Sequence, residues 1–209
     1  MKTQIILATG NKGKIREFTK MFSKLSIETI PLSSMENPPT IIEDGQTFFE
    51  NAIKKAETIS RTYGLPALAD DSGLEVDALG GDPGIYSARF AGPQATDKEN
   101  NAKLISLLNQ TSMVNRTARY VCALALSIPG KETMVVEETC EGLITLTPKG
   151  ENGFGYDPYF YLPEWGVTMA QMSEEQKNKI SHRGKALKKL EQLLMKEHWL
   201  HLYSIKERA

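Results

Sequence analysis

The sequence predicts an α/β fold with a mixed β-sheet, and two observations support this class. In the first half of the chain, short apolar runs alternate with amphipathic segments in the order strand, helix, strand, helix, strand. This order is typical of a partly parallel sheet covered by helices. In the second half, two long strand patterns flank a Pro-Gly turn and precede further helical segments, which indicates a hairpin region.

The first strand and helix are predicted at the start of the chain. Residues 4–8 form an apolar run, and residues 12–25 show apolar positions at helical spacing. Those positions are Ile15, Phe18, Met21, Phe22 and Leu25. Residues 27–32 read as a second strand, and residues 33–42, with two adjacent prolines, read as a loop.

A second helix and a third strand follow. Thr47 and Glu50 have the spacing of a capping box, and the helix they open is expected to end near Tyr63-Gly64. The third strand is predicted over residues 66–70, with a Ser-Gly turn after it and a glycine-rich stretch through Gly84.

The second half contains the hairpin region and two further capping boxes. Thr96 to Glu99 opens a helix that reaches about Asn109, and Ser173 to Gln176 opens another. Between them, strands are predicted over 117–128 and 133–146, and this meander is a candidate for a separate lobe. A last helical stretch begins at Ser181 and is marked by four leucines.

Composition limits the classes of function. Of 209 residues, 40% are hydrophobic and 24% are charged, as in an ordinary globular protein. The net charge of -1 argues against non-specific nucleic-acid binding, although it leaves room for a local basic pocket. No apolar run approaches the length of a membrane span, and the first strand is too short for a signal-peptide core, so we expect a cytoplasmic protein. Cys122 and Cys140 are expected to be reduced core thiols on neighbouring strands.

Two acidic segments predict a magnesium site. Asp70 and Asp71 follow a buried apolar run, which is expected to place both carboxylates at the open end of a strand. With Glu43 and Asp44, three or four carboxylates could converge on Mg²⁺, which takes hard oxygen ligands. The alternative for Glu43 and Asp44 is a solvated loop. This alternative is weaker for Asp70 and Asp71, because a carboxylate after a buried strand needs a partner.

A strand-to-helix loop is a candidate phosphate site. It comprises Thr9, Gly10, Asn11, Lys12, Gly13 and Lys14. Backbone N–H groups and the helix dipole favour an anion at such a helix start, and the lysines add positive charge. The Walker A spacing is absent, and the alternative is a plain helix start with solvated lysines.

Two segments are candidates for recognising a nucleobase. Phe154 lies in a Gly-Phe-Gly turn and could present its ring to a base, while Asp157 could accept a hydrogen bond from a base N–H. Lys177, and His182 and Arg183 in the first turn of the last helix, could contact phosphate or carbonyl oxygens. The alternative for the Phe154 segment is a turn with a core aromatic residue, and the alternative for His182 and Arg183 is a solvated helix start.

Together these segments resemble the inosine triphosphate pyrophosphatase family, also described as non-standard purine nucleoside triphosphate pyrophosphatases or dITP/XTP diphosphatases, in its bacterial branch. The matching strings run in family order from residue 8 to about 187. They are Ala8–Lys14, Thr47–Ala52, Ala69–Leu74, Gly80–Arg89, Gly153–Pro158 and Ser181–Gly184. The C-terminal extension from Lys196 to Ala209 looks longer than usual and concerns the dimer surface rather than catalysis.

The resemblance implies a fold, an activity and partners. Residues 1–209 would form one two-lobed domain around a long mixed sheet, with the active site in the cleft between the lobes. The protein would be a Mg²⁺-dependent homodimer that hydrolyses XTP, ITP and dITP to the monophosphate and pyrophosphate. Nucleic acid and membrane are not expected partners.

The resemblance also assigns roles to individual residues. Glu43 and Asp71 match the metal ligands, and Asp71 matches the proposed general base. Apart from the resemblance, we expect Asp70 to fix Asp71 or to hold waters of the same metal. The triphosphate would contact the loop from Thr9 to Lys14, and Lys55 matches a family lysine on the second helix. Further substrate contacts match Ser72, Phe154, Gly155, Tyr156, Asp157, Lys177, His182 and Arg183.

Three other functions are weighed against this one. A pyrophosphatase for modified pyrimidine nucleotides would not be expected to carry the segments around Phe154 and His182. A nucleotide sensor would not need the acidic pair. A metal-dependent nuclease would need a basic stripe, which the sequence lacks.

Overall fold

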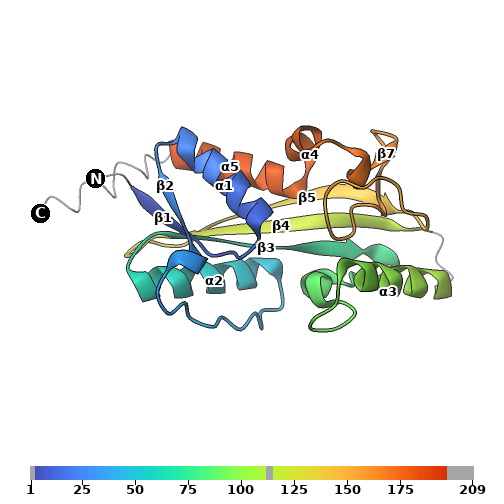
Figure 1. The fold of residues 1–209 in the computed structure, drawn as a ribbon, viewed down its shortest axis with the longest axis horizontal. Coiled ribbons are helices and arrows are strands. Elements are labelled where there is room, and N and C mark those ends of the chain that lie inside the picture. Colours follow the sequence, from blue (N-terminus) through green and yellow to red (C-terminus); the bar gives the residue numbers. More distant parts are fainter. Residues whose placement is uncertain (1–2, 112–114, 197–209) are drawn as a thin grey trace, which may run out of the picture. The chain divides into compact units, whose positions relative to one another are not determined.

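The computed structural model describes residues 3–111 and 115–196. Within them a seven-stranded sheet has the order β2-β1-β3-β4-β5-β6-β7, and helices flank it (Figure 1). It contains parallel and antiparallel pairs, so the predicted α/β class with a mixed sheet is confirmed. The C-terminal extension beyond Lys196 lies outside the described residues. No helix in the described part of the chain is both long and apolar enough to span a bilayer.

The observed elements follow the predicted order. The strands are β1 (Gln4–Leu7), β2 (Glu28–Pro31), β3 (Ala67–Val76), β4 (Thr117–Ser127), β5 (Met134–Ile144), β6 (Phe160–Leu162) and β7 (Val167–Thr168). The α-helices are α1 (Lys12–Lys24), α2 (Phe48–Tyr63), α3 (Asp97–Gln110), α4 (Glu174–Ile180) and α5 (His182–Lys196). The sequence patterns missed β6 and β7, because two or three residues are too few to show a strand period.

The chain divides into two compact units. The first comprises Met1–Asp71, Ala123–Glu137 and Ala186–Ala209, and the second comprises Ser72–Cys122 and Glu138–Lys185. The suggestion that residues 117–146 form a lobe of their own is therefore wrong. The tip of this hairpin belongs to the first unit and its two ends belong to the second, because strands of eleven residues are long enough to contribute to two cores.

In the first unit, β1 lies between two parallel neighbours. It pairs with β2 from Gln4↔Glu28 onward and with β3 at Ile6↔Ala67. Right-handed crossovers that lead to opposite sides of one strand place their helices on opposite faces of the sheet. Accordingly, α1 and α5 cover one face of this unit's strands and α2 covers the other (Figure 1).

The third strand is longer than predicted. It runs through Ser72-Gly73 to Val76, so Asp70 and Asp71 lie in the middle of a strand and not at its open end before a turn. Leu74 and Val76 are fully buried in the core of the second unit, and the Leu74 N–H donates to Ser87 Oγ at 2.8 Å. This burial outweighs the turn preference of a Ser-Gly pair.

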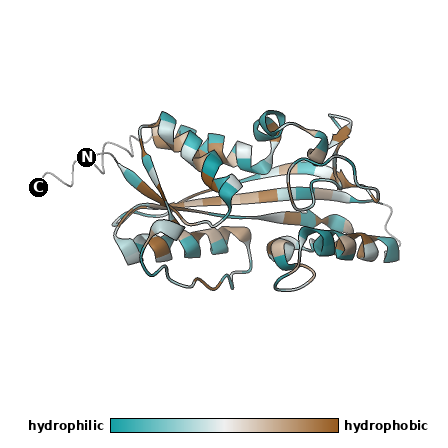
Figure 2. Cartoon of the chain, in the orientation of Figure 1, coloured by the Kyte–Doolittle hydropathy of each residue, from teal (hydrophilic) through white to brown (hydrophobic). Residues whose placement is uncertain are grey.

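The helix starts agree with the predicted caps, with one difference. Thr96 and Ser173 both complete capping boxes. The Thr47 hydroxyl accepts the Glu50 N–H, as predicted, but the Glu50 carboxylate accepts the N–H of Gln46 at 2.7 Å and not that of Thr47. Figure 2 shows hydrophobic and hydrophilic residues interleaved along the helices.

The second unit has its own apolar core. Buried residues from β3, β4, β5 and β6 meet side chains of α3, among them Leu104, Tyr120 and Phe160. Cys122 and Cys140 are buried free thiols, as the sequence predicts. The two units thus provide separate cores, and each carries part of the predicted site.

Candidate functional site

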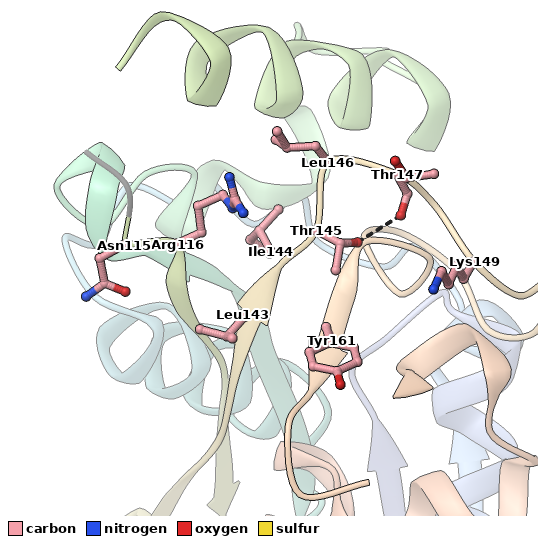
Figure 3. Close-up of a pocket in the computed structure, with 9 residues that line it drawn as sticks. All are labelled: Asn115, Arg116, Leu143, Ile144, Thr145, Leu146, Thr147, Lys149 and Tyr161. Atoms are coloured by element: carbon pink, nitrogen blue, oxygen red, sulfur yellow. Dashed lines mark hydrogen bonds between the residues drawn. The ribbon is translucent and has the colours of Figure 1, made fainter. Parts of the chain in front are cut away.

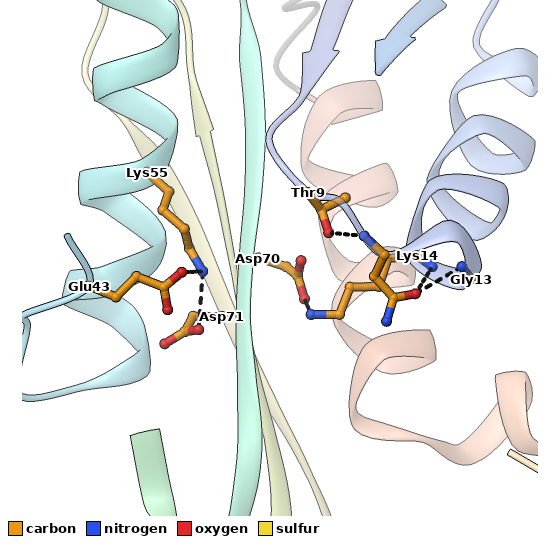
Figure 4. A network of polar contacts seen from close by, with 8 residues as sticks. Thr9, Gly13, Lys14, Glu43, Lys55, Asp70 and Asp71 are labelled. Carbon is orange, nitrogen blue, oxygen red and sulfur yellow. Dashed lines mark hydrogen bonds and ion pairs between the residues drawn. The ribbon is translucent and has the colours of Figure 1, made fainter. Parts of the chain in front are cut away.

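A buried lysine joins two of the predicted carboxylates in the first unit. Lys55 Nζ on α2 lies 3.1 Å from Asp71 Oδ1 and 3.3 Å from Glu43 Oε1 (Figure 4). Asn51, one helical turn earlier, donates from Nδ2 to Asp71 Oδ2 at 3.2 Å. Residues four apart on a helix share a face, so α2 directs an ammonium and an amide at the same carboxylate.

Burial and charge set the ionisation of this cluster. Burial raises the pKa of Asp71 above the usual value for aspartate, and it prevails although Lys55 and Asn51 act in the opposite direction. Burial lowers the pKa of Lys55, but the carboxylates around it reverse this effect, and the net pKa lies above the usual value. A carboxylate with a raised pKa accepts a proton more readily near neutral pH, which suits a general base.

The other member of the acidic pair faces away from Asp71. Asp70 lies on the opposite side of β3, where its buried carboxylate contacts Lys14 Nζ at 2.5 Å (Figure 4). Successive side chains of a strand point to opposite faces, and α1 and α2 approach β3 from opposite faces. The prediction that Asp70 supports Asp71, or holds waters of the same metal, is therefore wrong.

Only two of the four predicted carboxylates meet. Asp44 is exposed and contacts Lys54, so the expected convergence of three or four acids is also wrong. In the described part of the chain, no three His, Cys, Asp or Glu side chains are grouped closely enough to hold a metal ion. Glu43 and Asp71, which share Lys55, provide the hard oxygen donors that Mg²⁺ prefers, and one or two carboxylates are its usual number of protein ligands.

The predicted phosphate loop is a capped helix start. Asn11 is the N-cap of α1, and its Oδ1 accepts the N–H groups of Gly13 at 2.8 Å and Lys14 at 3.1 Å. The Asn11 N–H in turn donates to Thr9 Oγ1. Gly10 and Lys12 are exposed beside it. A phosphate would therefore compete with the Asn11 side chain for two of the first-turn donors.

Sequence reasoning missed Asn51 as part of this cluster. Its Oδ1 accepts the Gly45 N–H at 2.8 Å, which orients the amide so that its NH₂ group points to Asp71. A Cβ on Gly45 would lie 2.7 Å from that oxygen, so glycine permits the contact. The spacing of Asn51 and Lys55 predicts that they share a helix face, but it does not show that this face meets Asp71.

The second unit carries the predicted base-recognition residues. The Phe154 ring is 50% exposed. Lys177 Nζ lies 5.0 Å from its centroid, and the Arg183 guanidinium carbon lies 5.7 Å from it. An exposed ring flanked by cations is a suitable surface for an aromatic base.

Asp157 holds the turn that carries Phe154. It is 2% exposed, and its carboxylate accepts the Tyr120 hydroxyl at 3.2 Å and the Phe154 N–H at 3.0 Å, and contacts Lys177. Its two oxygens are thus engaged with three donors. A carboxylate has about four acceptor sites, so a base N–H, as the sequence suggested, would have only Oδ1 left to contact, and that oxygen is buried.

The neighbouring residues of the turn are anchored as well. The Gly155 N–H donates to the Asp97 carboxylate at 2.7 Å, and Asn101 Nδ2 donates to the Gly155 carbonyl at 2.9 Å. The buried Tyr156 donates from its hydroxyl to the Ser87 carbonyl at 2.8 Å. Sequence reasoning did not connect Asp97 or Asn101 with this turn, because they lie more than fifty residues away along the chain.

The last predicted segment has the expected local structure. His182 and Arg183 begin α5, both are buried, and the Ser181 hydroxyl accepts the Gly184 N–H at 3.1 Å. A Cβ on Gly184 would lie 1.9 Å from the Asn178 carbonyl oxygen, which explains the glycine. Ser72 is the first residue of the second unit and lies half-buried in β3.

A pocket of about 590 Å³ in the second unit is separate from these residues (Figure 3). Arg116, Leu143, Leu146, Lys149 and Tyr161 are among the residues that line it. It contains no acidic side chain and none of the predicted site residues. A second pocket, of about 610 Å³ beside Trp165, contains none of the predicted site residues either.

The fold and these clusters define a class of α/β protein. In it, a capped loop joins β1 to α1, and the neighbouring parallel strand β3 carries a carboxylate that is bridged to a second one by a lysine. Such sites suit polyanionic ligands. A family model described as the Ham1 family matches residues 5–193, and the chain belongs to this family. The family resemblance of the sequence motifs is thereby confirmed.

Individual relatives agree over most of the chain. A Geobacillus kaustophilus (strain HTA426) protein named dITP/XTP pyrophosphatase is 54% identical over 90% of this chain and 93% of its own length. The solved structure of the Staphylococcus aureus Ham1 protein matches with a TM-score of 0.87 and 44% identity, covering 93% of this chain and 100% of that one. A HAM1 protein structure from Coxiella burnetii matches with a TM-score of 0.88 and 41% identity, covering 93% and 99%.

Proposed function

We propose that this chain hydrolyses non-standard purine nucleoside triphosphates, namely dITP, XTP and ITP, to the monophosphate and pyrophosphate. Such an activity removes deaminated purines from the nucleotide pool. The observation that carries the proposal is the Asp71 cluster: a partly buried carboxylate with a raised pKa, held by Lys55 and Asn51. Family membership and the printed names of relatives such as the Geobacillus protein support the substrate class.

In this proposal Asp71 is the general base. It orients a water and takes its proton as the water attacks the α-phosphorus. Lys55 stabilises negative charge on the phosphates. Lys14 with the loop from Thr9 holds the departing pyrophosphate, for which Lys14 has to leave its ion pair with Asp70 on the other face of β3. Positioning and electrostatics provide most of the catalysis of phosphoryl transfer, which agrees with a site built of fixed charges.

Glu43 and Asp71 would be the ligands of Mg²⁺. The donor set fits, since both are carboxylates that approach a common cationic position, now taken by the Lys55 ammonium. When bound, the ion would neutralise charge on the phosphate oxygens.

The residues of the second unit would recognise the purine. Phe154 offers an exposed ring for stacking, and Arg183, Lys177 and His182 are donors suited to the 6-carbonyl group of hypoxanthine or xanthine. Adenine carries an amino group at that position and would leave these donors unpaired, which can reject a substrate by about 10⁴-fold.

We also propose that the protein is a homodimer located in the cytoplasm. The family resemblance of the motifs supports the dimer, which light scattering would test. The cytoplasmic location is supported by the substrate class, because nucleoside triphosphates are made and used there.

One assay tests the activity. Pyrophosphate and orthophosphate release are measured with dITP, ITP, XTP, GTP and ATP, each with Mg²⁺ and with a chelator. We expect pyrophosphate from the first three and none from ATP, and only with the metal. GTP shares the 6-carbonyl, so its turnover measures whether the site also refuses the 2-amino group of guanine. Equal turnover of ATP and ITP would contradict the account of selectivity, and release of orthophosphate in place of pyrophosphate would contradict the reaction.

Two variants test the role of the base. Asp71→Asn should lower kcat by about 10²–10⁴, the usual contribution of a general base. Asp77→Asn is the control, because Asp77 is exposed, belongs to the second unit and contacts Arg119 and Thr117, not the residues of the cluster. A near-normal kcat in Asp71→Asn would remove Asp71 from this role.

A further inference from the structure

Tyr120 is a buried hydroxyl that the proposed mechanism does not use. It lies on β4 in the core of the second unit, 7% exposed, with its ring centroid 4.5 Å from that of Phe160. Its hydroxyl donates to Asp157 Oδ1 at 3.2 Å. Burial, reinforced by the negative charge of Asp157, raises the pKa of Tyr120 well above its usual value, so the hydroxyl stays protonated and remains a donor.

The same side chain also contacts the start of α5. The Tyr120 and His182 rings are stacked, with centroids 4.8 Å apart and an angle of 14° between their planes. Asp157 and His182 lie 25 positions apart in the sequence, and each belongs to a different proposed purine-binding segment. One core residue therefore contacts both segments, one through its hydroxyl and the other through its ring.

These contacts bear on the position of the exposed Phe154 ring. Asp157 accepts the Phe154 N–H and contacts Lys177, whose ammonium lies over the Phe154 ring. A displacement of Asp157 would thus move the ring and the cation together. A site that distinguishes ligands by hydrogen-bond pattern needs donors held to within about half an ångström, which requires supports of this kind.

We propose that Tyr120 is a specificity-determining positioning residue: its hydroxyl holds the Asp157 turn and its ring sets the plane of the His182 imidazole, so that both segments meet a purine in fixed orientations. The inference rests on the proposed function, in which these segments bind the base. It assigns Tyr120 no contact with substrate. Its effect is on discrimination between purines and on KM, not on the chemical step, whose residues lie in the first unit.

Tyr120→Phe tests this inference, because it removes the hydroxyl and keeps the stacked ring. A hydrogen bond to a charged group is worth enough to predict about a tenfold rise in KM for dITP, with kcat within about twofold of wild type. The preference for dITP over ATP should fall by a similar factor. Tyr161→Phe is the matched control, since Tyr161 lies in the same unit on β6 and lines the pocket of Figure 3.

A double variant separates positioning from a general loss of packing. If Tyr120 acts through Asp157, Tyr120→Phe combined with Asp157→Asn should raise KM no more than the stronger single change does. Tyr120→Leu, which also removes the stacked ring, should reduce the preference for dITP further. Urea unfolding of each variant monitors folding independently.

The outcomes distinguish this inference from the function on which it rests. If the wild type fails to prefer dITP over ATP, the proposed function fails. If the wild type shows that preference but Tyr120→Phe keeps its KM and its preference, the inference is overturned. A fall in kcat alone, or fully additive effects of the Tyr120 and Asp157 changes on KM, would overturn it as well.

Discussion

Replacing Lys55 by methionine tests whether burial and charge at Asp71 are balanced as the structure indicates. The change keeps the length and helix propensity of the side chain but removes the cation that contacts Asp71 at 3.1 Å and Glu43 at 3.3 Å. It leaves a partly buried carboxylate without its principal compensating charge. We therefore expect a loss of stability that depends on pH.

The magnitude follows from burial. Breaking a buried ion pair costs about 3–5 kcal/mol, because the remaining charge stays desolvated. The Asp71 side chain keeps 13% exposure and Glu43 keeps 35%, so water compensates part of the loss. We expect Lys55→Met to lower the free energy of unfolding by about 2–3 kcal/mol at about pH 8.

The sign of the pH dependence follows from the raised pKa of Asp71. The folded state holds the Asp71 proton more tightly than the unfolded state, so ionising this group costs stability as the pH rises through the folded pKa. Without Lys55 that pKa rises further. The stability difference between wild type and Lys55→Met should shrink as the pH falls and Asp71 takes up its proton, and should widen toward about pH 8.

Urea unfolding in chelator at several pH values measures these quantities. Lys54→Met is the matched control on the same helix, since Lys54 contacts the exposed Asp44, and its urea midpoint should change little at any pH. The double variant Lys55→Met/Asp71→Asn should lose about 1–2 kcal/mol less than the sum of the single changes. A cost of Lys55→Met that is independent of pH, or equal to that of Lys54→Met, would refute the reasoning.

Three further predictions follow from particular contacts. Gly45→Ala places a Cβ 2.7 Å from the Asn51 amide oxygen, so it should lower kcat about tenfold and destabilise the fold by about 1–3 kcal/mol. Steady-state kinetics and urea titration measure the two effects, and unchanged kinetics would mean that Asn51 does not support Asp71. Ser173→Ala removes the cap of α4 and should cost about 1 kcal/mol in unfolding free energy, and no change would contradict the capping assignment. Burial raises the pKa of Cys140 to about 11, so a thiol reagent at about pH 8 should label it only after unfolding; rapid labelling of the native protein would contradict its burial.

Local patterns in the sequence predicted most of the elements. The starts of α3 and α4 depend on side chains within three residues of the cap, and the periodicity of α1 depends on residues within one or two turns. Such short-range interactions are visible without knowledge of the fold. The same holds for the position of His182 and Arg183 in the first turn of α5.

The extent of β3 could not be predicted in this way. Whether Ser72-Gly73 turns or continues as a strand is decided by the burial of Leu74 and Val76 against residues far along the chain. The partners of the acidic pair depend on the same non-local organisation. Asp70 meets Lys14 and Asp71 meets Lys55, because the helices that carry these lysines cover opposite faces of one strand.

The sequence by itself determined which chemical groups this protein has and the order in which its helices and strands occur, since both are written in neighbouring residues. Only the tertiary structure decided which carboxylate each lysine contacts, that Asn51 orients Asp71, and that Tyr120 and Asp97 hold the turn around Phe154. The physical reason is that strand alternation, crossover side and core packing are properties of the assembled sheet, and they assign partners that no sequence spacing encodes.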